Sequence, residues 1–280
     1  MIVLDSMSRD YAFLVSEIRT QGQREVSRGI AHREVIAPQI RLRKPLYSLS
    51  DGIGRGVSLQ VAWLEGMQLI AGESYPELMV KHAPQFNAYR DGQVFHGAYG
   101  PRIAPQIPVV LDRLQRDRGS RQAIVNIWDP LYDSQDRRDL PCTLSFQFLI
   151  RDNRLVMVTT MRSNDVWLGF PYDVFQFTLL QKTIANCLGI RAGDYIHTGG
   201  SMHLYDHDVH RSLSLFSRAA TDADEVEGIH SGKSSVLERW RDCQHIAREA
   251  LEGAVRTDQR WSGSAAARTV VALYGKLNNV

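Results

Sequence analysis

The middle of the chain carries the clearest alternation of apolar and polar side chains. Apolar residues stand at every second position from Leu144 to Ile150, and a second apolar run, LVMVTTM, follows at 155–161. Alternation with a period of two is typical of a strand that buries one face. Asp152 and Asn153 stand between the two runs, and both residue types favour tight turns. The sequence therefore predicts a β-hairpin.

Apolar residues recur at steps of three and four elsewhere in the chain. This spacing predicts helices over 8–19, 57–71, 109–116, 174–188 and 234–255, the fourth ended by Gly189. The segment AIVNIW at 123–128 predicts another strand, and the arginine-rich segment 23–29 predicts a loop. We therefore expect an α+β fold in which a mixed central sheet is flanked by helices.

Composition indicates an ordinary globular protein. The chain has 280 residues, 44% of them apolar and 23% charged, with neither repeats nor a convincing linker, so we expect a single domain over 1–280. A formal charge of +2 is too small to favour nucleic acid or an anionic membrane as a partner. No apolar run is long enough to span a bilayer, and the first residues do not resemble a signal peptide, so the expected location is cytoplasmic.

Cysteine usage points to reduced thiols. Cys142, Cys187 and Cys243 cannot all pair, and their spacing fits no zinc motif, so we expect no metal. Cys142 lies between a proline and a strand, where it is either a buried apolar residue or a nucleophile activated by nearby cations. Arg162 and Ser163 together offer donors for a phosphate. Asp173 stands at the start of a predicted helix, where it caps the helix or faces a ligand.

Several linked motifs resemble the thymidylate synthase superfamily. They occur in the family's order and spacing, and similarity extends over roughly residues 24–210, leaving a divergent, helical C-terminal part at about 212–280. The residues that carry the resemblance are Pro141-Cys142, Gln147, Arg162-Ser163-x-Asp165, Leu168-Gly169-x-Pro171, Gly199-Gly200-x-x-His203-x-Tyr205, Gly97-x-Tyr99-Gly100, Ser120-Arg121, Glu65 and Arg28.

The resemblance implies an enzyme that binds a pyrimidine nucleoside monophosphate together with 5,10-methylenetetrahydrofolate. Cys142 would add to C6 of the base, and C5 would then attack the folate methylene carbon. A sheet-mediated homodimer with shared active sites is implied, with Arg121 donated by a second subunit. The implied roles are catalysis for Cys142, Glu65, Tyr99 and Asp165, base recognition for Asp173, Gln147 and Gly169, phosphate binding for Arg28, Arg121, Arg162 and Ser163, and sugar binding for His203 and Tyr205.

One departure from the synthases changes the expected substrate. The family reads uracil with the asparagine of a P-F-N sequence, whereas this chain has Pro171-Tyr172-Asp173. An ionised carboxylate only accepts hydrogen bonds, so it repels O4 of uracil but accepts from the N4 amino group of cytosine. A second bond, to N3, needs a proton there. Asp173 therefore predicts a cytidylate, dCMP or CMP, as the substrate.

Other departures favour hydroxymethylation over methylation. Thr143 follows the cysteine where synthases usually have histidine, and the surrounding motifs resemble phage deoxycytidylate hydroxymethylases, in which water captures the C5 methylene. The final residues, 276–280, do not resemble the synthase tail that excludes water, and Gln122 replaces a phosphate-binding arginine. The alternatives are a synthase-like C5-methyltransferase acting on dCMP or dUMP, a deoxyuridylate hydroxymethylase, a catalytically silent nucleotide-binding homologue, and an RNA-binding protein that uses the arginine-rich face.

Overall fold

The structure is a computed structural model that describes residues 1–44, 55–134, 137–215 and 234–256. The final residues 276–280, and most of the divergent C-terminal part, lie outside this description. The strands are β1 (Ile2–Leu4), β2 (Gln23–Ser27), β3 (Ile30–Ile36), β4 (Gln39–Leu42), β5 (Ile124–Asn126), β6 (Thr143–Arg151), β7 (Arg154–Asp165) and β8 (Arg191–Tyr205). The helices are α1 (Met7–Gln21), α2 (Leu59–Ala71), α3 (Pro76–His82), the 3₁₀ helix η2 (Pro84–Tyr89), α4 (Tyr99–Ile103), α5 (Ile107–Arg116), α6 (Pro130–Asp133), α7 (Phe170–Cys187), α8 (Asp206–Ser212) and α9 (Val236–Arg256).

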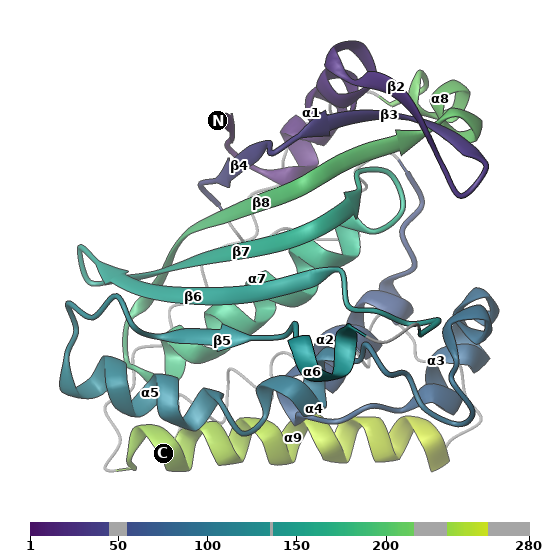
Figure 1. The fold of residues 1–280 in the computed structure, drawn as a ribbon. Coiled ribbons are helices and arrows are strands. Elements are labelled where there is room, and N and C mark those ends of the chain that lie inside the picture. The colour runs from purple at the N-terminus through teal and green to yellow at the C-terminus, as the bar shows by residue number, and fades with distance from the viewer. Residues whose placement is uncertain (45–54, 135–136, 216–233, 257–280) are drawn as a thin grey trace.

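A mixed sheet forms the centre of the fold. Its main path runs in the order β1-β4-β8-β7-β6-β5, and the β2–β3 hairpin joins it through β3, which pairs with β8. β6 and β7 form the predicted antiparallel hairpin, and β7 and β8 are parallel. A parallel pair needs a crossover connection, and α7 supplies it, because it lies between β7 and β8 in the chain (Figure 1). The predicted α+β class is confirmed.

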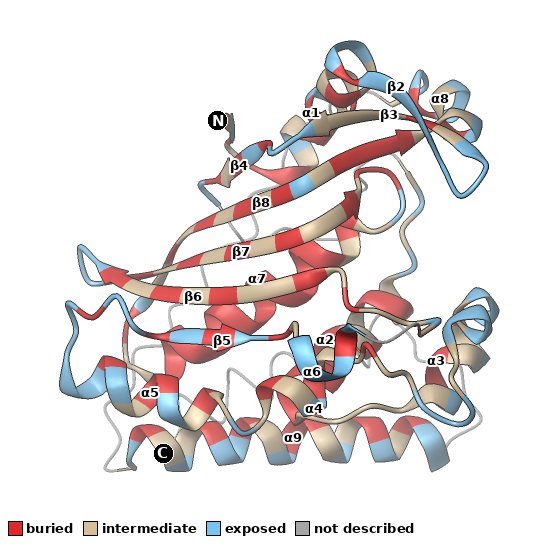
Figure 2. Cartoon of the chain, viewed as in Figure 1, coloured by how far each residue is buried: buried red, intermediate tan, exposed pale blue. Residues whose placement is uncertain are grey.

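Helix α7 forms the core behind this sheet. Nearly all of its residues are buried, and it contacts β7, β8, α2 and α9. In Figure 1 it passes behind the strands, and Figure 2 shows buried positions alternating with half-exposed ones along β6, β7 and β8. On the other face, no helix of the described residues crosses β6 to β8 in this view. The half-exposed side chains of that open face include Ser145, Gln147, Leu149, Val156, Val158 and Thr160.

Most predicted elements are confirmed. The five predicted helices correspond to α1, α2, α5, α7 and α9, and the strand predicted at 123–128 corresponds to β5. The loop predicted at 23–29 is wrong, because residues 23–27 form β2 and pair with β3. All five β2 residues are exposed, so the sequence of this strand shows no apolar alternation. The hydrogen bonds to β3 determine its extended conformation instead. Within the described residues, no helix is long and apolar enough to cross a membrane.

Candidate active site

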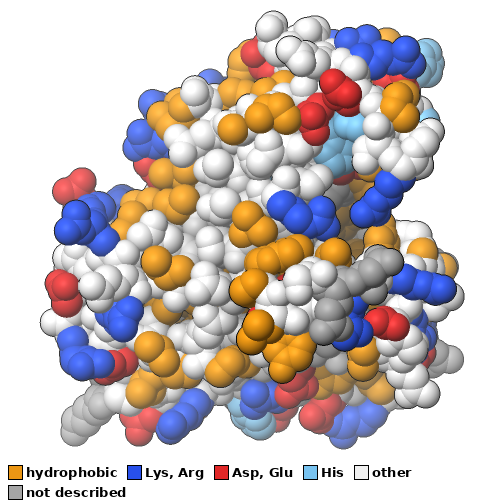
Figure 3. Space-filling view, in the orientation of Figure 1, with side chains coloured by type: hydrophobic (Ala, Val, Ile, Leu, Met, Phe, Trp, Pro, Cys, Tyr) orange, Lys and Arg blue, Asp and Glu red, His pale blue; other side chains and the backbone are white. Residues whose placement is uncertain are grey.

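Several of the predicted functional residues lie at three strand ends that come together on one side of the sheet. Cys142 immediately precedes β6, and Thr143 pairs with Met161 near the end of β7. Asp165, the last residue of β7, pairs with His203 near the end of β8. The antiparallel and parallel pairings therefore bring the beginning of β6 beside the carboxyl ends of β7 and β8. Figure 3 shows basic and histidine side chains gathered on this part of the surface.

Arg162 binds the segment that carries Cys142. Its Nε donates to the carbonyl of Pro141 at 3.0 Å, and its Nη2 donates to the carbonyl of Leu140 at 3.1 Å and to Cys142 Sγ at 3.5 Å. Burial raises the pKa of the Cys142 thiol, while the positive charge of Arg162 lowers it and the charge of Asp173 raises it. Arg162 therefore fixes the thiol and partly offsets the cost of forming a thiolate there.

Asp173 lies in the first turn of α7, and the helix is capped by Gly169. The capping role considered for Asp173 is therefore excluded. Its Oδ2 accepts a hydrogen bond from Asn164 Nδ2 at 2.7 Å, and its Oδ1 accepts one from Gln176 Nε2 at 3.2 Å. Burial raises the pKa of Asp173 to about 7, although both hydrogen bonds lower it. A Cβ at Gly169 would lie 3.4 Å from Asp173 Oδ2, so the main chain at Gly169 passes close to the carboxyl group.

Glu65 and Tyr99 add two groups that hold protons. Burial, and then the charge of Asp173, raise the pKa of Glu65 to about 8, and its Oε2 is buried without a hydrogen-bond partner. Burial raises the pKa of Tyr99 well above its usual value, and the charges of Asp173 and Cys142 raise it further, while hydrogen bonds with Thr143 lower it. Both side chains are therefore mainly protonated at neutral pH and can donate a proton to a neighbour.

Asp165, His203, Tyr205 and Arg28 form the opposite side of the site. Asp165 Oδ1 accepts hydrogen bonds from the main-chain nitrogens of Trp167 at 2.8 Å and Leu168 at 3.0 Å. The rings of His203 and Tyr205 lie 5.0 Å apart. Arg28 sits at the β2–β3 turn with φ of 51°, and its charge lowers the pKa values of Cys142 and Tyr205.

Ser163 completes this side of the site, since it lies on β7 one residue beyond Arg162 and pairs with Ser201 of β8. The structure thus brings the Cys142 side of the site and the His203 side together.

Gln147 and Arg121 are not brought to the Cys142 group. Gln147 stands five positions after Cys142, which is roughly 17 Å of strand. The Gln147 amide instead donates to the main-chain carbonyl of Arg121 at 2.8 Å. Arg121 is exposed and precedes β5, whose Ile124 pairs with Gln147. Arg121 therefore lies far from the thiol of its own chain.

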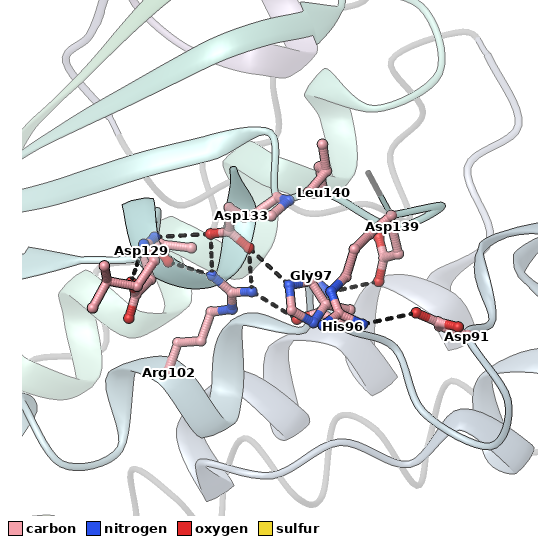
Figure 4. A network of polar contacts seen from close by, with 12 residues as sticks. Asp91, His96, Gly97, Arg102, Asp129, Asp133, Asp139 and Leu140 are labelled. Carbon is pink, nitrogen blue, oxygen red and sulfur yellow. Dashed lines mark hydrogen bonds and ion pairs between the residues drawn. The ribbon is translucent and has the colours of Figure 1, made fainter. Parts of the chain in front are cut away.

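Sequence reasoning missed a polar network that supports the site. Arg102 donates to both carboxylate oxygens of Asp133 at 2.6 and 2.8 Å, and to the carbonyl of His96 at 2.8 Å (Figure 4). Asp139 accepts from the main-chain nitrogen of Gly97 at 2.8 Å. These contacts fix the beginning of α4, which carries Tyr99, against the segment that leads into Cys142. The residues are distant in sequence and match no short motif, so no local signal reveals them.

Burial of the Glu65 carboxyl group leads to a stability prediction. A group whose pKa rises from 4.5 to about 8 on folding makes unfolding easier as the pH rises through that range, because the unfolded state releases the proton there while the folded state retains it. Glu65→Gln keeps the shape and does not titrate. We expect its stability relative to the wild type to be about 4 kcal/mol greater at pH 9 than at pH 4.5. Denaturant unfolding at the two pH values measures this, and an equal difference at both would contradict it.

Comparison with known proteins agrees with this arrangement. The family model for thymidylate synthase matches residues 82–238. The chain is 30% identical over 173 residues to the deoxyuridylate hydroxymethyltransferase of Pseudomonas phage M6, covering 59% of this chain and 49% of that protein. It is 26% identical over 239 residues to the deoxyuridylate hydroxymethyltransferase of Bacillus phage SP01, covering 79% of this chain and 61% of that protein.

The chain thus spans about half to three fifths of the length of these relatives. The family match covers more than half of the chain and includes Cys142, Arg162, Asp173 and His203. This protein belongs to the thymidylate synthase family.

Proposed function

We propose that this protein hydroxymethylates C5 of a cytidine 5′-monophosphate, dCMP or CMP, with 5,10-methylenetetrahydrofolate as co-substrate. The observation that carries the proposal is Asp173, a buried carboxyl group that acts electrostatically on Cys142, Glu65 and Tyr99. By the family resemblance, it stands where a synthase would have the uracil-reading amide. The names of the two phage relatives support hydroxymethyl transfer to a pyrimidine nucleotide.

Cys142 begins the proposed reaction. Its sulfur adds to C6 of the base, and the electron pair of the C5–C6 bond makes C5 nucleophilic towards the methylene carbon that the folate supplies. Loss of the C5 proton releases tetrahydrofolate and leaves an exocyclic methylene group. Water adds to this carbon, and expulsion of the Cys142 thiolate then restores the ring. The net products are the 5-hydroxymethyl nucleotide and tetrahydrofolate.

Other residues bind and move protons in this scheme. Arg162, Ser163 and Arg28 would hold the 5′-phosphate, and His203 and Tyr205 the sugar hydroxyl. Glu65 and Tyr99 would transfer protons through water, which fits the unpartnered Glu65 Oε2. Exposed Leu168 and the Tyr172 ring offer apolar surface for the folate, and Asp165 and Gly169 would line the base and folate site. Gln147 has no role in this scheme, because its amide donates to the main-chain carbonyl of Arg121.

A pKa of about 7 suits Asp173 to cytosine. The base presents a donor at N4 and an acceptor at N3, so a single proton shared between N3 and the carboxyl group completes two hydrogen bonds. When that proton lies on N3, the ring is more electrophilic at C6. When Asp173 ionises, the carboxylate still accepts from the N4 amino group of cytosine, whereas it offers no donor to O4 of uracil.

Deoxyuridylate is the second candidate substrate, because both relatives are named for it. A protonated Asp173 offers one donor and one acceptor, as an amide does, and would match O4 and N3–H of uracil.

The test is to incubate the protein with dCMP, CMP and dUMP separately, each with methylenetetrahydrofolate, and to identify the products by mass spectrometry. We expect a hydroxymethylated cytidylate and no increase in absorbance from dihydrofolate. Turnover of dUMP alone would contradict the cytosine assignment. Formation of dihydrofolate would contradict hydroxymethylation, because that product accompanies reduction of the methylene group to methyl.

We further propose that the open face of the sheet pairs two copies of the chain and that Arg121 of one copy binds phosphate in the site of the other. The half-exposed apolar side chains of β6 and β7 support this pairing, as does the separation of Arg121 from its own Cys142.

Mixing inactive variants tests this sharing. Cys142→Ala and Arg121→Ala are each expected to be nearly inactive. After mixed unfolding and refolding, half of the dimers would be hybrids with one intact site each, restoring about a quarter of wild-type activity. Each variant refolded with itself is the control. No recovery in hybrids isolated with two different affinity tags would contradict a shared site.

A further inference from the structure

Asp173 is held by two buried side-chain amides. Asn164, the penultimate residue of β7, donates to Oδ2, and Gln176, one helical turn after Asp173 on α7, donates to Oδ1. Asn164 and Gln176 are 4% and 6% exposed, so water does not compete freely for these contacts. We call Asn164 and Gln176 the amide clamp.

The clamp leaves a defined acceptor pattern on the carboxylate. Each carboxylate oxygen has two lone pairs, and the clamp occupies one on each oxygen. One acceptor position per oxygen remains, which matches the N4–H and protonated N3–H pair of a cytosine. Uracil presents an acceptor, O4, to one of these positions. A carboxylate held in this way therefore discriminates against uracil, provided that it stays ionised.

We propose that the Asn164–Gln176 clamp sets the base selectivity of this site by orienting the Asp173 carboxylate and favouring its ionised form. Both are positioning residues, since they act through Asp173 and need not touch the substrate. This inference rests on the proposed function, because it explains how a cytidylate would be preferred over a uridylate.

Charges around Asp173 act against the clamp. Burial raises the pKa of the carboxyl group, and the charge of Asp165 at the end of β7 raises it further. Asp173 also interacts electrostatically with Glu65 of α2, Tyr99 of α4, Cys142 before β6 and Tyr195 of β8. Each of these groups is an acid, so their ionisation disfavours a second negative charge nearby. The two amide donors are therefore the main groups that favour ionisation of Asp173.

The test compares kcat/KM for dCMP and dUMP from pH 6 to pH 9. Gln176→Met keeps the approximate size of the side chain and removes its N–H donors. We expect Gln176→Met to lower the dCMP:dUMP ratio of kcat/KM about tenfold at pH 7.5. The pH midpoint of that ratio should move up by about one unit, because Asp173 stays protonated to higher pH without this donor. Asn164→Ala is expected to act in the same direction, and it serves if Gln176→Met folds poorly.

Gln181→Met is the matched control. Gln181 is also buried on α7, but its amide donates to the carbonyls of Leu155, Gly193 and Asp194. Its loss should lower stability and leave the substrate ratio and its midpoint unchanged. In an Asp173→Asn background, Gln176→Met should not move the pH midpoint, because no carboxyl group remains at that position.

The outcomes separate the two claims. Exclusive use of dUMP by the unaltered protein overturns the proposed function and the clamp with it. A wild type that prefers a cytidylate, with an unchanged ratio and midpoint in both clamp variants, overturns the clamp alone. An equal fall in the ratio for Gln181→Met would show that general loosening of α7 accounts for the effect, and this also overturns the clamp.

Discussion

Cys142→Ala is expected to abolish turnover while the nucleotide still binds. In the proposed reaction, the thiolate forms the bond to C6 that makes C5 nucleophilic, and no other thiol of the described residues lies at the strand ends that form the site. Loss of a covalent nucleophile typically lowers kcat by five to six orders of magnitude, down to a residual rate supported by binding alone. We therefore expect a fall on the order of 10⁵-fold, measured as tetrahydrofolate released under saturating nucleotide. Binding should survive, because the phosphate and sugar contacts remain.

The matched control is Cys243→Ala. Cys243 is fully buried on α9, and its thiol contacts Cys187 at the end of α7. Replacing it should lower stability and leave kcat within a few-fold of the wild type. Equal nucleotide binding by the wild type and Cys142→Ala, with no turnover in either, would identify a silent nucleotide-binding homologue. Unchanged turnover in Cys142→Ala would contradict covalent catalysis.

The fold was predictable where burial imposes a period on the sequence. The β6–β7 hairpin alternates because one face packs on α7, and α7 itself is recognisable from its apolar residues and the Gly189 that follows it. β2 was not predictable, because an exposed edge strand carries no such period. Its conformation depends on hydrogen bonds to β3, the next strand of the chain.

The site was predictable as a set of residue types but not as a set of contacts. The linked motifs identified Cys142, Arg162 and Asp173, and the structure brings them together around the beginning of β6. The position of Asp173 relative to the helix cap was left open by the sequence, and it depends on α7 beginning at Phe170.

Gln176 was missed entirely, although it follows Asp173 at the three-residue spacing that places two side chains on one helix face. Its hydrogen bond to Asp173 becomes apparent only when the helix register is known. Spacing alone could have named it as a candidate partner of the carboxylate.

Asp173→Asn is expected to reverse the base preference. An asparagine amide whose orientation is fixed by its neighbours Asn164 and Gln176 presents a donor to O4 and an acceptor to N3–H of uracil. It cannot protonate N3 of cytosine, so it neither pairs with that base in this orientation nor activates its ring. A site that hydrogen-bonds one base leaves buried polar groups unpaired with the other, and such mismatches discriminate strongly. We expect the dCMP:dUMP ratio of kcat/KM to change by about 10³-fold, towards dUMP.

The exchange suits the surrounding structure. Asn164 Oδ1 is buried without a hydrogen-bond partner, so rotation of the Asn164 amide would let this oxygen accept from an asparagine at position 173. The variant should therefore fold normally. Above pH 7 it should be more stable than the wild type, in which a buried carboxyl group with a pKa raised to about 7 must ionise inside the protein.

The pH dependence provides an internal check. In the wild type, the dCMP:dUMP ratio should rise with pH through about 7, because ionisation of Asp173 removes the donor that uracil requires. In Asp173→Asn the ratio should be flat over the same range. An Asp173→Asn variant that keeps the wild-type ratio at every pH would show that the base is read elsewhere, and the cytidylate assignment would then lose its physical basis.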